Sequence, residues 1–440
     1  MPAISTNKLR VTNVDFFKDH VGNNPTYIFI GKTSQWNADD TPPSIADSTV
    51  DHYTAFEEIV GLKRIISTNV HSVLPRRDWV EGAVYDEYSD KVNIIDGKNP
   101  ETNDFYKFYV ITSEFNVYKC ISNNNRAQST VMPTGNSVNV FQTPDGYLWK
   151  YMYTVKTSDA FEFMTPLWIP CYTLYANDDS SQWLVQQAAV SGTIDHVVVT
   201  NSGANYDPNN PPTVEITGDG TGASAVAVIN DLNNTIDKIL IVDSGSGYTS
   251  ATVTITDATG VGGEAEAVIS PIGGHGHDAR AELGATYAMI RVPLEGDESG
   301  LFPTNISYRR AGVLSRPEST DVGVAVYAAG AVGLYQVGET LTGLGSGATG
   351  VIRYIDQFRN MIYLESVTGQ YTVGERISSQ SYNETTVEQL FEGINLPLVA
   401  TVAASTDYVD RSGELLYVLT RSKVTRDDKQ TEEVRFIVSF

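Results

Sequence analysis

The chain contains two short patterns whose residue types could bind phosphate groups. Gly31-Lys32-Thr33 resembles the end of a phosphate-binding loop, but Thr26 stands where that loop requires its first glycine. Gly345-x-Gly347-x-x-Gly350 fits a dinucleotide fingerprint by its letters, yet Val351–Ile355 after it is patterned as a strand. The helix N-terminus that would face a pyrophosphate is therefore missing. We expect a turn at Gly345–Gly350, no phosphate cradle at Gly31–Thr33, and no cofactor.

His275-Gly276-His277-Asp278 offers side chains that can bind zinc. It lies in a Gly-rich joint at Gly273–His277, where such residues more often cross a protein surface, so we predict no metal site. The adjacent carboxylates Asp427-Asp428 and Glu432-Glu433 are candidates for acid–base catalysis. Neighbours on a strand point to opposite faces, which makes them poor catalytic pairs. The sequence predicts no catalytic residue and no enzyme activity.

The stretch Val73–Trp79 places two guanidinium groups, a carboxylate and an indole around a proline. Arginine can hold a carboxylate with two parallel hydrogen bonds while a tryptophan packs below it. We predict an anchored turn in which Arg77 has an Asp or Glu partner. The residues with this structural or interface role would be Arg76, Arg77, Asp78 and Trp79.

The segment from Ile194 to Ser270 contains nearly the same sequence twice. Ile194-Asp195 recurs as Ile236-Asp237, and Tyr206 recurs as Tyr248, both 42 positions later. Gly220, Gly222 and Ile229 recur 40 positions later as Gly260, Gly262 and Ile269. Two repeats are too few for a solenoid. We predict a small pseudo-symmetric β domain inserted into a body of different character.

The repeats have the hydrophobic patterns of strands. Val197-Val198-Val199 and Ile239-Leu240-Ile241 are short apolar runs, which predict strands buried on both faces. In Thr213–Thr217 and Thr252–Thr256 apolar residues alternate with polar ones, so one face should be wet. The Gly-rich joints between them should supply the positive φ of tight turns.

The remaining sequence favours a mainly β fold with a few helices. We predict a helix at Asn13–Val21, and a second one opened by the capping pattern Thr54-x-x-Glu57 and carrying an apolar stripe through Ile66. Strands are predicted at Asp104–Ile121 and Tyr147–Val155. Further strands are expected at Ala285–Val292, Asn305–Leu314 and the alternating C-terminal stretch Val434–Val438.

A second insert has a weaker internal echo. Tyr335-x-Val337-Gly338-Glu339 recurs as Tyr371-x-Val373-Gly374-Glu375, 36 positions later. The predicted architecture is therefore an α+β, β-rich body interrupted by small β modules. Its predicted segments are the body at 1–185, 273–320 and 391–440, the duplicated module at 186–272, and the second module at 321–390.

The composition excludes several classes of protein. The 440 residues carry a formal net charge of −23, which repels nucleic acid and anionic membranes at long range. No apolar run approaches the ~18 residues of a membrane-spanning helix, and the first thirty residues lack the apolar core of a signal peptide. The two cysteines, Cys120 and Cys171, do not suggest a disulfide framework. We expect a protein folded in a cytoplasm, without nucleic-acid binding or membrane insertion.

Four stretches together resemble the baseplate wedge subunits encoded by gene eight of T-even-type, contractile-tailed bacteriophages. The resemblance covers roughly 9–170, 285–315 and 400–440, and leaves out both inserts. The stretches that carry it are Phe29-Ile30-Gly31-Lys32 with Trp36; Val73–Trp79; Val117–Cys120 with Asp145–Tyr151; and Arg411–Glu414 with Tyr417, Gln430–Glu433 and Phe440.

The resemblance implies a structural part of the virion's tail baseplate, made in the host bacterial cytoplasm. It implies a homodimer that joins other baseplate wedge proteins, with no catalytic residues and no cofactor. An alternative is a tail-associated binding module whose Gly-rich inserts contact host-surface glycans or neighbouring tail proteins. The resemblance adds candidates for the structural or interface role, which are Trp149, Arg411, Glu414 and Glu432.

Overall fold

The computed structural model describes residues 6–382 and 385–440, and most of its regular structure is β-strand. The chain forms two compact units. The first comprises Met1–Val14, His71–Met289 and Ile437–Phe440, and the second comprises Asp15–Val70 and Ile290–Phe436. The predicted mainly β fold class with a few helices is confirmed. The predicted segment boundaries stay predictions.

Of the described elements, β3 (Val70–Pro75) crosses a boundary between the two units' ranges by one residue, and three others that cross a boundary match predicted elements. Helix α1 (Asn7–Asn23) contains the predicted helix at Asn13–Val21. Strand β15 (Tyr287–Glu295) contains most of the predicted strand Ala285–Val292, and β25 (Thr431–Ser439) is the predicted closing strand.

The first unit contains a four-stranded antiparallel sheet rich in aromatic residues. Its core forms around Trp149, which is fully buried and stacks on Tyr147 with ring centroids 5.5 Å apart. Tyr85 meets the same indole edge-on at 5.7 Å. The sheet order is β4 (Tyr109–Ile111), β5 (Asn116–Ser122), β7 (Leu148–Thr154) and β6 (Phe141–Gln142).

Shorter elements complete this unit. Strand β3 (Val70–Pro75) pairs with β8 (Trp168–Pro170) through Val73↔Pro170. The side chain of Ser180 caps helix α4 by accepting a hydrogen bond from the Trp183 N–H. The helices are α3 (Thr157–Phe163), α4 (Ser181–Ala188) and α5 (Ala279–Leu283).

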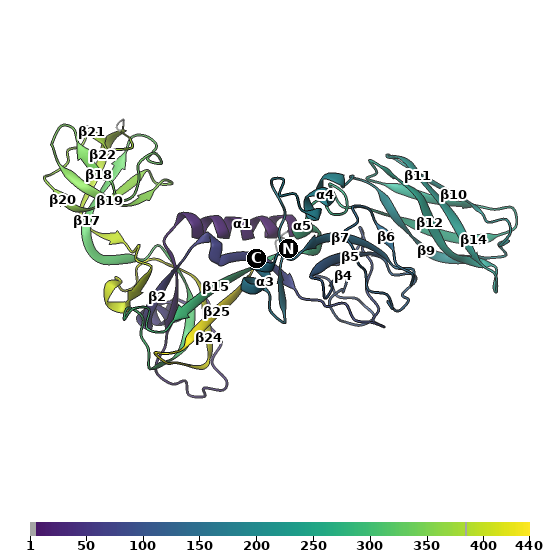
Figure 1. Cartoon of the computed structure of the whole chain (residues 1–440), viewed down its shortest axis with the longest axis horizontal. Helices are drawn as coiled ribbons and strands as arrows, with labels where there is room; N and C mark the ends of the chain where they lie inside the picture. The colour runs from purple at the N-terminus through teal and green to yellow at the C-terminus, as the bar shows by residue number, and fades with distance from the viewer. Residues whose placement is uncertain (1–5, 383–384) are drawn as a thin grey trace. The chain divides into compact units, whose positions relative to one another are not determined.

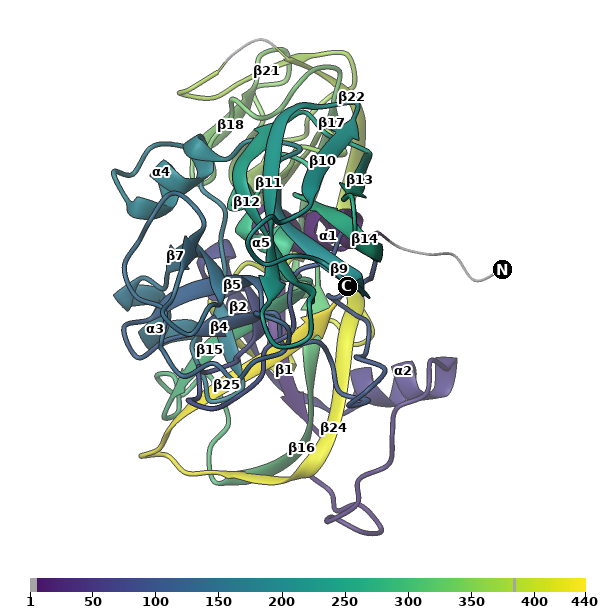
Figure 2. The ribbon, with the colours of Figure 1, turned by 90° about the vertical axis from the view of Figure 1, so that its right-hand side faces the viewer.

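The predicted internal repeat forms a six-stranded antiparallel sheet, whose strands lie side by side in Figure 1 and Figure 2. Its order is β13-β10-β11-β12-β9-β14, and the two end strands β13 and β14 also contact each other. One repeat supplies three strands and the other supplies their equivalents. The bounds are β9 (Ile194–Ala204), β10 (Thr213–Gly218), β11 (Thr221–Asn230), β12 (Thr235–Ser246), β13 (Ala251–Thr256) and β14 (Val261–Ile269).

Each repeat inserts a tyrosine against a glycine of the other. Tyr206 packs on Gly260, where an added Cβ would lie 2.1 Å from the ring, and its hydroxyl accepts a hydrogen bond from the Gly263 N–H at 3.0 Å. Tyr248 packs equivalently on Gly220, where a Cβ would lie 2.5 Å from the ring. These glycines are therefore required by close approach of an aromatic ring.

The prediction that the central apolar runs are buried on both faces is wrong. Leu240 is 40% exposed and Val198 is half-buried, whereas Val197 and Ile239 lie in the core. The inner face is closed by small and β-branched residues, but the outer face of the sheet is open. The alternation predicted for β10 and β13 is confirmed, with Thr and Glu side chains on the exposed face.

The second unit contains a five-stranded antiparallel sheet centred on β1, whose six residues are all buried. Figure 2 shows β24 running beside β16 in this sheet. The order is β23 (Val402–Ala404), β2 (Ile59–Ile65), β1 (Thr26–Gly31), β16 (Ile306–Ser315) and β24 (Glu414–Arg426).

The helix predicted to open at Thr54 is wrong. Helix α2 spans Thr49–Glu57, begins at the Ser48 cap, and contains only Phe56 of the predicted apolar stripe Phe56, Ile59, Val60 and Ile66. Ile59 starts β2 instead, and Ile66 is 52% exposed. Residues Ile59–Ile65 pair with β1 on one side and, through Gly61–Lys63, with β23 on the other, and this tertiary pairing outweighs the local helical signal.

The second module is a closed barrel, in the order β17-β20-β19-β18-β21-β22. The two copies of its repeated sequence pattern also make equivalent hydrogen bonds. The Tyr335 hydroxyl donates to the Ile377 carbonyl at 3.1 Å, and the Tyr371 hydroxyl donates to the Leu341 carbonyl at 2.7 Å. The bounds are β17 (Glu318–Ala328), β18 (Thr340–Gly343), β19 (Thr349–Asp356), β20 (Met361–Thr368), β21 (Arg376–Ser378) and β22 (Thr385–Pro397).

In both modules the first and the last residues lie close together in space. The Ser270 N–H donates to the Thr193 carbonyl at 2.8 Å at the base of the six-stranded sheet. The Leu398 N–H donates to the Pro317 carbonyl at 2.9 Å at the base of the barrel. A module with adjacent ends can be added to a sheet without separating the strands that flank it.

Candidate interface residues and a pocket beside the duplicated sheet

The Arg76–Trp79 turn begins where β3 ends. Arg76 donates to Asp78 through Nη2 at 2.8 Å and through Nε at 3.0 Å. The Arg77 guanidinium lies over the Tyr109 ring, 5.3 Å from its centroid. Among residues 6–382 and 385–440 the structure shows no ion pair of Arg77, and its Asp or Glu partner stays a prediction. Residues at alternate positions of an extended chain lie on the same face, so Asp78 forms its ion pair with Arg76.

The two predicted tryptophans have internal positions. Trp79 is half-buried, and its Nε1 donates to the Ser129 hydroxyl at 3.1 Å. Trp149 has no exposed surface. A partner protein cannot reach Trp149, so its role in this fold is to fill the core of the first unit.

Arg411 and Glu414 lie on the surface of the second unit. Arg411 pairs with Glu57 and lies 5.0 Å over the Tyr53 ring, while its side chain stays 49% exposed. Glu414 pairs with Arg316 at 3.2 Å and is 61% exposed. Such exposed pairs contribute little to stability. Both side chains are accessible to another protein.

Glu432 is instead part of a buried ion pair. Its Oε1 lies 3.4 Å from Nε of Arg426, which is fully buried. Burial raises the pKa of Glu432, and the Arg426 guanidinium opposes that shift. Arg426 also donates to the carbonyls of Pro303 at 3.1 Å and Gly296 at 2.6 Å. The predicted residues thus fall in separate places on two units, and the structure does not gather them into one site.

Sequence reasoning missed a buried charged cluster in the first unit. The Lys119 ammonium lies 2.8 Å from Glu282 Oε2, 3.0 Å from His275 Nδ1, and 4.0 Å from the centre of the Tyr88 ring. The side chains of Lys119, Glu282 and His275 are at most 4% exposed. Glu282 Oε1 also accepts a hydrogen bond from the Gly276 N–H at 2.8 Å.

This cluster corrects the prediction for the Gly273–His277 joint. His275 is buried there, and the Asp278 carboxylate caps α5 by accepting hydrogen bonds from the N–H groups of Arg280 and Ala281. Asp278 before a short apolar segment is a helix-start signal that the sequence did contain. Within the part of the chain that the structure describes, no group of three or more metal-binding side chains is found.

The electrostatics of the cluster follow from burial and pairing. Burial alone would raise the pKa of Glu282, but the Lys119 ammonium and His275 outweigh it and lower that pKa to about 2. Burial and the nearby Lys119 ammonium lower the pKa of His275 to about 4, against the opposing effect of Glu282. Glu282 is therefore ionised and His275 neutral near neutral pH.

The lowered His275 pKa predicts acid sensitivity of the first unit. The unfolded chain protonates this residue near pH 6.5, whereas the folded chain does so near pH 4. The contribution of neutral His275 to the free energy of unfolding is complete above pH 6.5 and is lost as the pH falls towards 4. When the pH is lowered from about 7 to about 5, the free energy of unfolding should fall by about 1–2 kcal/mol because of His275.

Urea unfolding of His275→Gln at both pH values measures this effect. The variant should lose less stability on acidification than the parent protein, because glutamine does not titrate. His277→Gln is the matched control, since that side chain is exposed two residues away. Equal acid sensitivity of the parent and the His275 variant would contradict the assignment.

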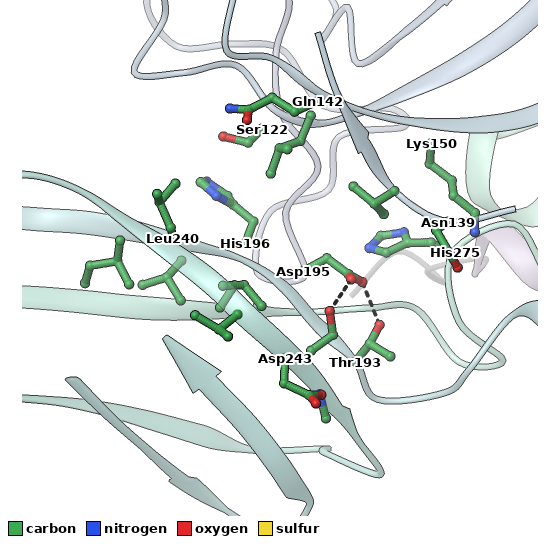
Figure 3. Close-up of a pocket in the computed structure, with 18 of the residues that line it drawn as sticks. Ser122, Asn139, Gln142, Lys150, Thr193, Asp195, His196, Leu240, Asp243 and His275 are labelled. Carbon is green, nitrogen blue, oxygen red and sulfur yellow. Dashed lines mark hydrogen bonds between the residues drawn. The ribbon is translucent and has the colours of Figure 1, made fainter. Parts of the chain in front are cut away.

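A pocket of about 720 Å³ lies between the six-stranded sheet and the four-stranded sheet of the first unit. Figure 3 shows Asp195 on one wall, where its carboxylate accepts hydrogen bonds from Thr193 at 2.7 Å and Ser244 at 2.8 Å. His275 reaches the base of the pocket from the buried cluster. The other wall is formed mainly by residues around β6 and β7, namely Val138, Asn139, Val140, Gln142, Leu148 and Lys150.

Comparison with known proteins finds similarity for the first part of the chain. Residues 3–131 match the family model described as Bacteriophage T4, Gp8. The baseplate wedge protein gp8 of Enterobacteria phage T4 is 20% identical over 188 residues, which are 35% of this chain and 55% of that protein. The chain thus spans about half the length of this relative. The predicted resemblance is confirmed, and the family match includes the Arg76–Trp79 turn.

No described helix is long and apolar enough to cross a membrane.

Proposed function

We propose that this protein is a structural subunit of a phage tail baseplate wedge. The observation that carries the proposal is the family match over residues 3–131, which includes β1, β2 and the Arg76–Trp79 turn. The relative in Enterobacteria phage T4 is itself named a baseplate wedge protein. Antiparallel sheets held by buried ion pairs suit a part that works through shape. On this proposal the chain catalyses no reaction.

The proposal includes partners and location. The chain pairs with a second copy of itself and with other wedge proteins around the tail hub, within the virion, after synthesis in the host cytoplasm. Arg411 and Glu414 are our candidates for such contacts, because they are charged and at least 49% exposed. Arg76 and Asp78 are held to each other and keep the turn in shape.

Mass analysis of purified phage particles after gentle dissociation tests this function. We expect copies per tail in a multiple of six, released together with other baseplate proteins, and light scattering of the purified chain should show a dimer. Particles that lack the chain would overturn the function. A monomer at micromolar concentration would overturn the pairing alone.

One observation favours an additional binding role for the duplicated sheet. Val226, Leu240 and Val242 point outward from β11 and β12 and are 49%, 40% and 69% exposed. An exposed apolar patch on a protein surface commonly marks an interaction site. We propose that this module adds a contact with a neighbouring protein to the wedge subunit.

A further inference from the structure

Two buried lysines lie opposite each other in the four-stranded sheet of the first unit. Lys119 of β5 and Lys150 of β7 are Cα partners across the two strands, so both side chains leave the sheet on the same face. Lys119 has no exposed surface, and Lys150 is 4% exposed. Like charges at opposed positions destabilise a sheet, so each ammonium group requires its own acceptors.

Glu282 provides acceptors for Lys119 but not for Lys150. Its Oε2 accepts a hydrogen bond from Lys119 Nζ at 2.8 Å, and its Oε1 accepts one from the Gly276 N–H at 2.8 Å. Within the described chain, Lys150 Nζ has one acceptor, the Val138 carbonyl at 2.5 Å, and no ion pair. Because an ammonium group has three N–H donors, two of them remain without an acceptor from the described residues.

His275 presents a second unpaired donor. Lys119 Nζ lies 3.0 Å from His275 Nδ1, and an ammonium group can only donate, so Nδ1 is the acceptor. A neutral imidazole that accepts through Nδ1 carries its hydrogen on Nε2. In the part of the chain that the structure describes, Nε2 has no hydrogen-bond partner. His275 is 5% exposed and lines the pocket, where Figure 3 shows its ring.

The local sequence brings these donors to one end of the pocket, where Figure 3 shows Lys150, Asn139 and His275. Asn139 directly follows the Val138 carbonyl that accepts from Lys150, and it is exposed. Gly276 directly follows His275, and an added Cβ at Gly276 would lie 2.9 Å from Lys150 Cε. A glycine is therefore required for this approach, and two buried donors lie beside a side-chain amide.

The two carboxylates that line the pocket do not pair with Lys150. Asp195 accepts hydrogen bonds from two hydroxyl groups of its own sheet, and Asp243 is exposed and accepts one from the Gly245 N–H at 3.0 Å. Lys238 adds a further cation to the lining. Burial lowers the pKa of Lys150, and the nearby carboxylates oppose that shift only in part. The pocket thus contains a buried cation without a paired anion.

We propose that this end of the pocket binds the carboxylate or phosphate group of a small molecule, held by Lys150 Nζ, His275 Nε2 and the Asn139 amide. Such a group only accepts hydrogen bonds, so it matches a set of donors, and it supplies the charge that Lys150 lacks. A neutral hydroxyl group would supply no charge. The volume of about 720 Å³ lies within the ~300–1,000 Å³ of ligand-binding pockets, so it also admits the body of the ligand. This inference does not depend on the proposed wedge function.

Calorimetric titration of the full chain with sodium phosphate and with sodium glucuronate, at constant ionic strength, tests the site. We expect at least one of them to bind, and the tighter of the two identifies the acidic group. Lys150→Gln should weaken binding about tenfold or more, because it removes a charged donor. Asn139→Ala should weaken it about threefold and leave the fold intact, because Asn139 is exposed. Lys156→Gln is the matched control, since this exposed lysine lies outside the pocket, and it should leave the affinity within about twofold.

Urea unfolding gives an independent readout. The anion that binds should raise the unfolding midpoint of the parent chain more than that of Lys150→Gln, because the general effect of the salt is the same in both. Binding of neither anion to the parent chain, unchanged affinity in Lys150→Gln, or an equal loss in Lys156→Gln would overturn the proposal. If Lys150→Gln does not fold, the Asn139 variant decides: a threefold loss supports the site, and an unchanged affinity overturns it.

Discussion

Replacing Lys119 with alanine is expected to destabilise the first unit by about 3–5 kcal/mol. Lys119 is fully buried and lies 2.8 Å from a Glu282 carboxylate that is 4% exposed. Without the ammonium, Glu282 either stays charged in an interior where water cannot reach it or takes up a proton, and both lower the stability of the folded state. Urea unfolding followed by tryptophan fluorescence measures the change.

Two further variants separate this cause from simple loss of packing. Lys91→Ala removes a lysine whose ion pair with Glu266 has the same 2.8 Å distance but is more than half exposed, so it should cost at most about 1 kcal/mol. The double variant Lys119→Ala, Glu282→Gln should recover part of the stability, because no charge then remains buried. A Lys119 variant no less stable than the Lys91 variant would contradict the role of the buried pair.

The buried cluster also shows where sequence reasoning ends. Lys119 follows Tyr118 in a strand and has no local feature that separates it from a surface lysine. Its partner Glu282 is 163 positions away. A pairing of this kind depends on how distant segments pack, and no periodicity or spacing in the sequence reports it. The joint at Gly273–His277 was misjudged for the same reason, because glycine-rich composition does not reveal burial.

Other features were predictable because the determining residues are close in sequence or repeat along it. The duplicated sheet could be predicted since Tyr206 and Tyr248 fulfil equivalent roles in the two repeats, so the same residue types recur. Asp78 pairs with Arg76, because alternate residues of an extended chain lie on the same face. The predicted helix at Thr54 failed because Thr54 lies inside a helix that Ser48 caps, and because Ile59–Ile65 pair as a strand.

The two inserted modules explain why the resemblance to wedge subunits is confined to parts of the chain. Both modules lie outside residues 3–131. Each has adjacent ends and its own apolar core, so each can be gained without changing the strand order of the flanking sheets. Surface features of the modules, such as the exposed Val226, Leu240 and Val242, can therefore change without changing the flanking sheets.

Gly260→Ala is expected to destabilise the duplicated sheet by about 2–4 kcal/mol. The new Cβ would lie 2.1 Å from the Tyr206 ring, which cannot move aside because its hydroxyl is held by the Gly263 N–H. Gly262→Ala is the informative comparison. Gly262 has a positive φ of 78°, yet an added Cβ there would have its nearest contact at 3.9 Å, so the change should cost only about 1–2 kcal/mol.

A double-mutant cycle assigns the effect to the ring. In a Tyr206→Ala background, Gly260→Ala should cost little, which gives a coupling energy of about 2 kcal/mol or more. Hydrogen exchange of β9 and β14 amides measures the local stability of the sheet in all four proteins. The prediction is contradicted if Gly262→Ala proves more costly than Gly260→Ala, or if the cycle shows no coupling. Backbone conformation would then explain why the same spacing of glycines recurs in the two repeats. The expected order instead assigns that spacing to the reciprocal packing of one tyrosine from each repeat against the other.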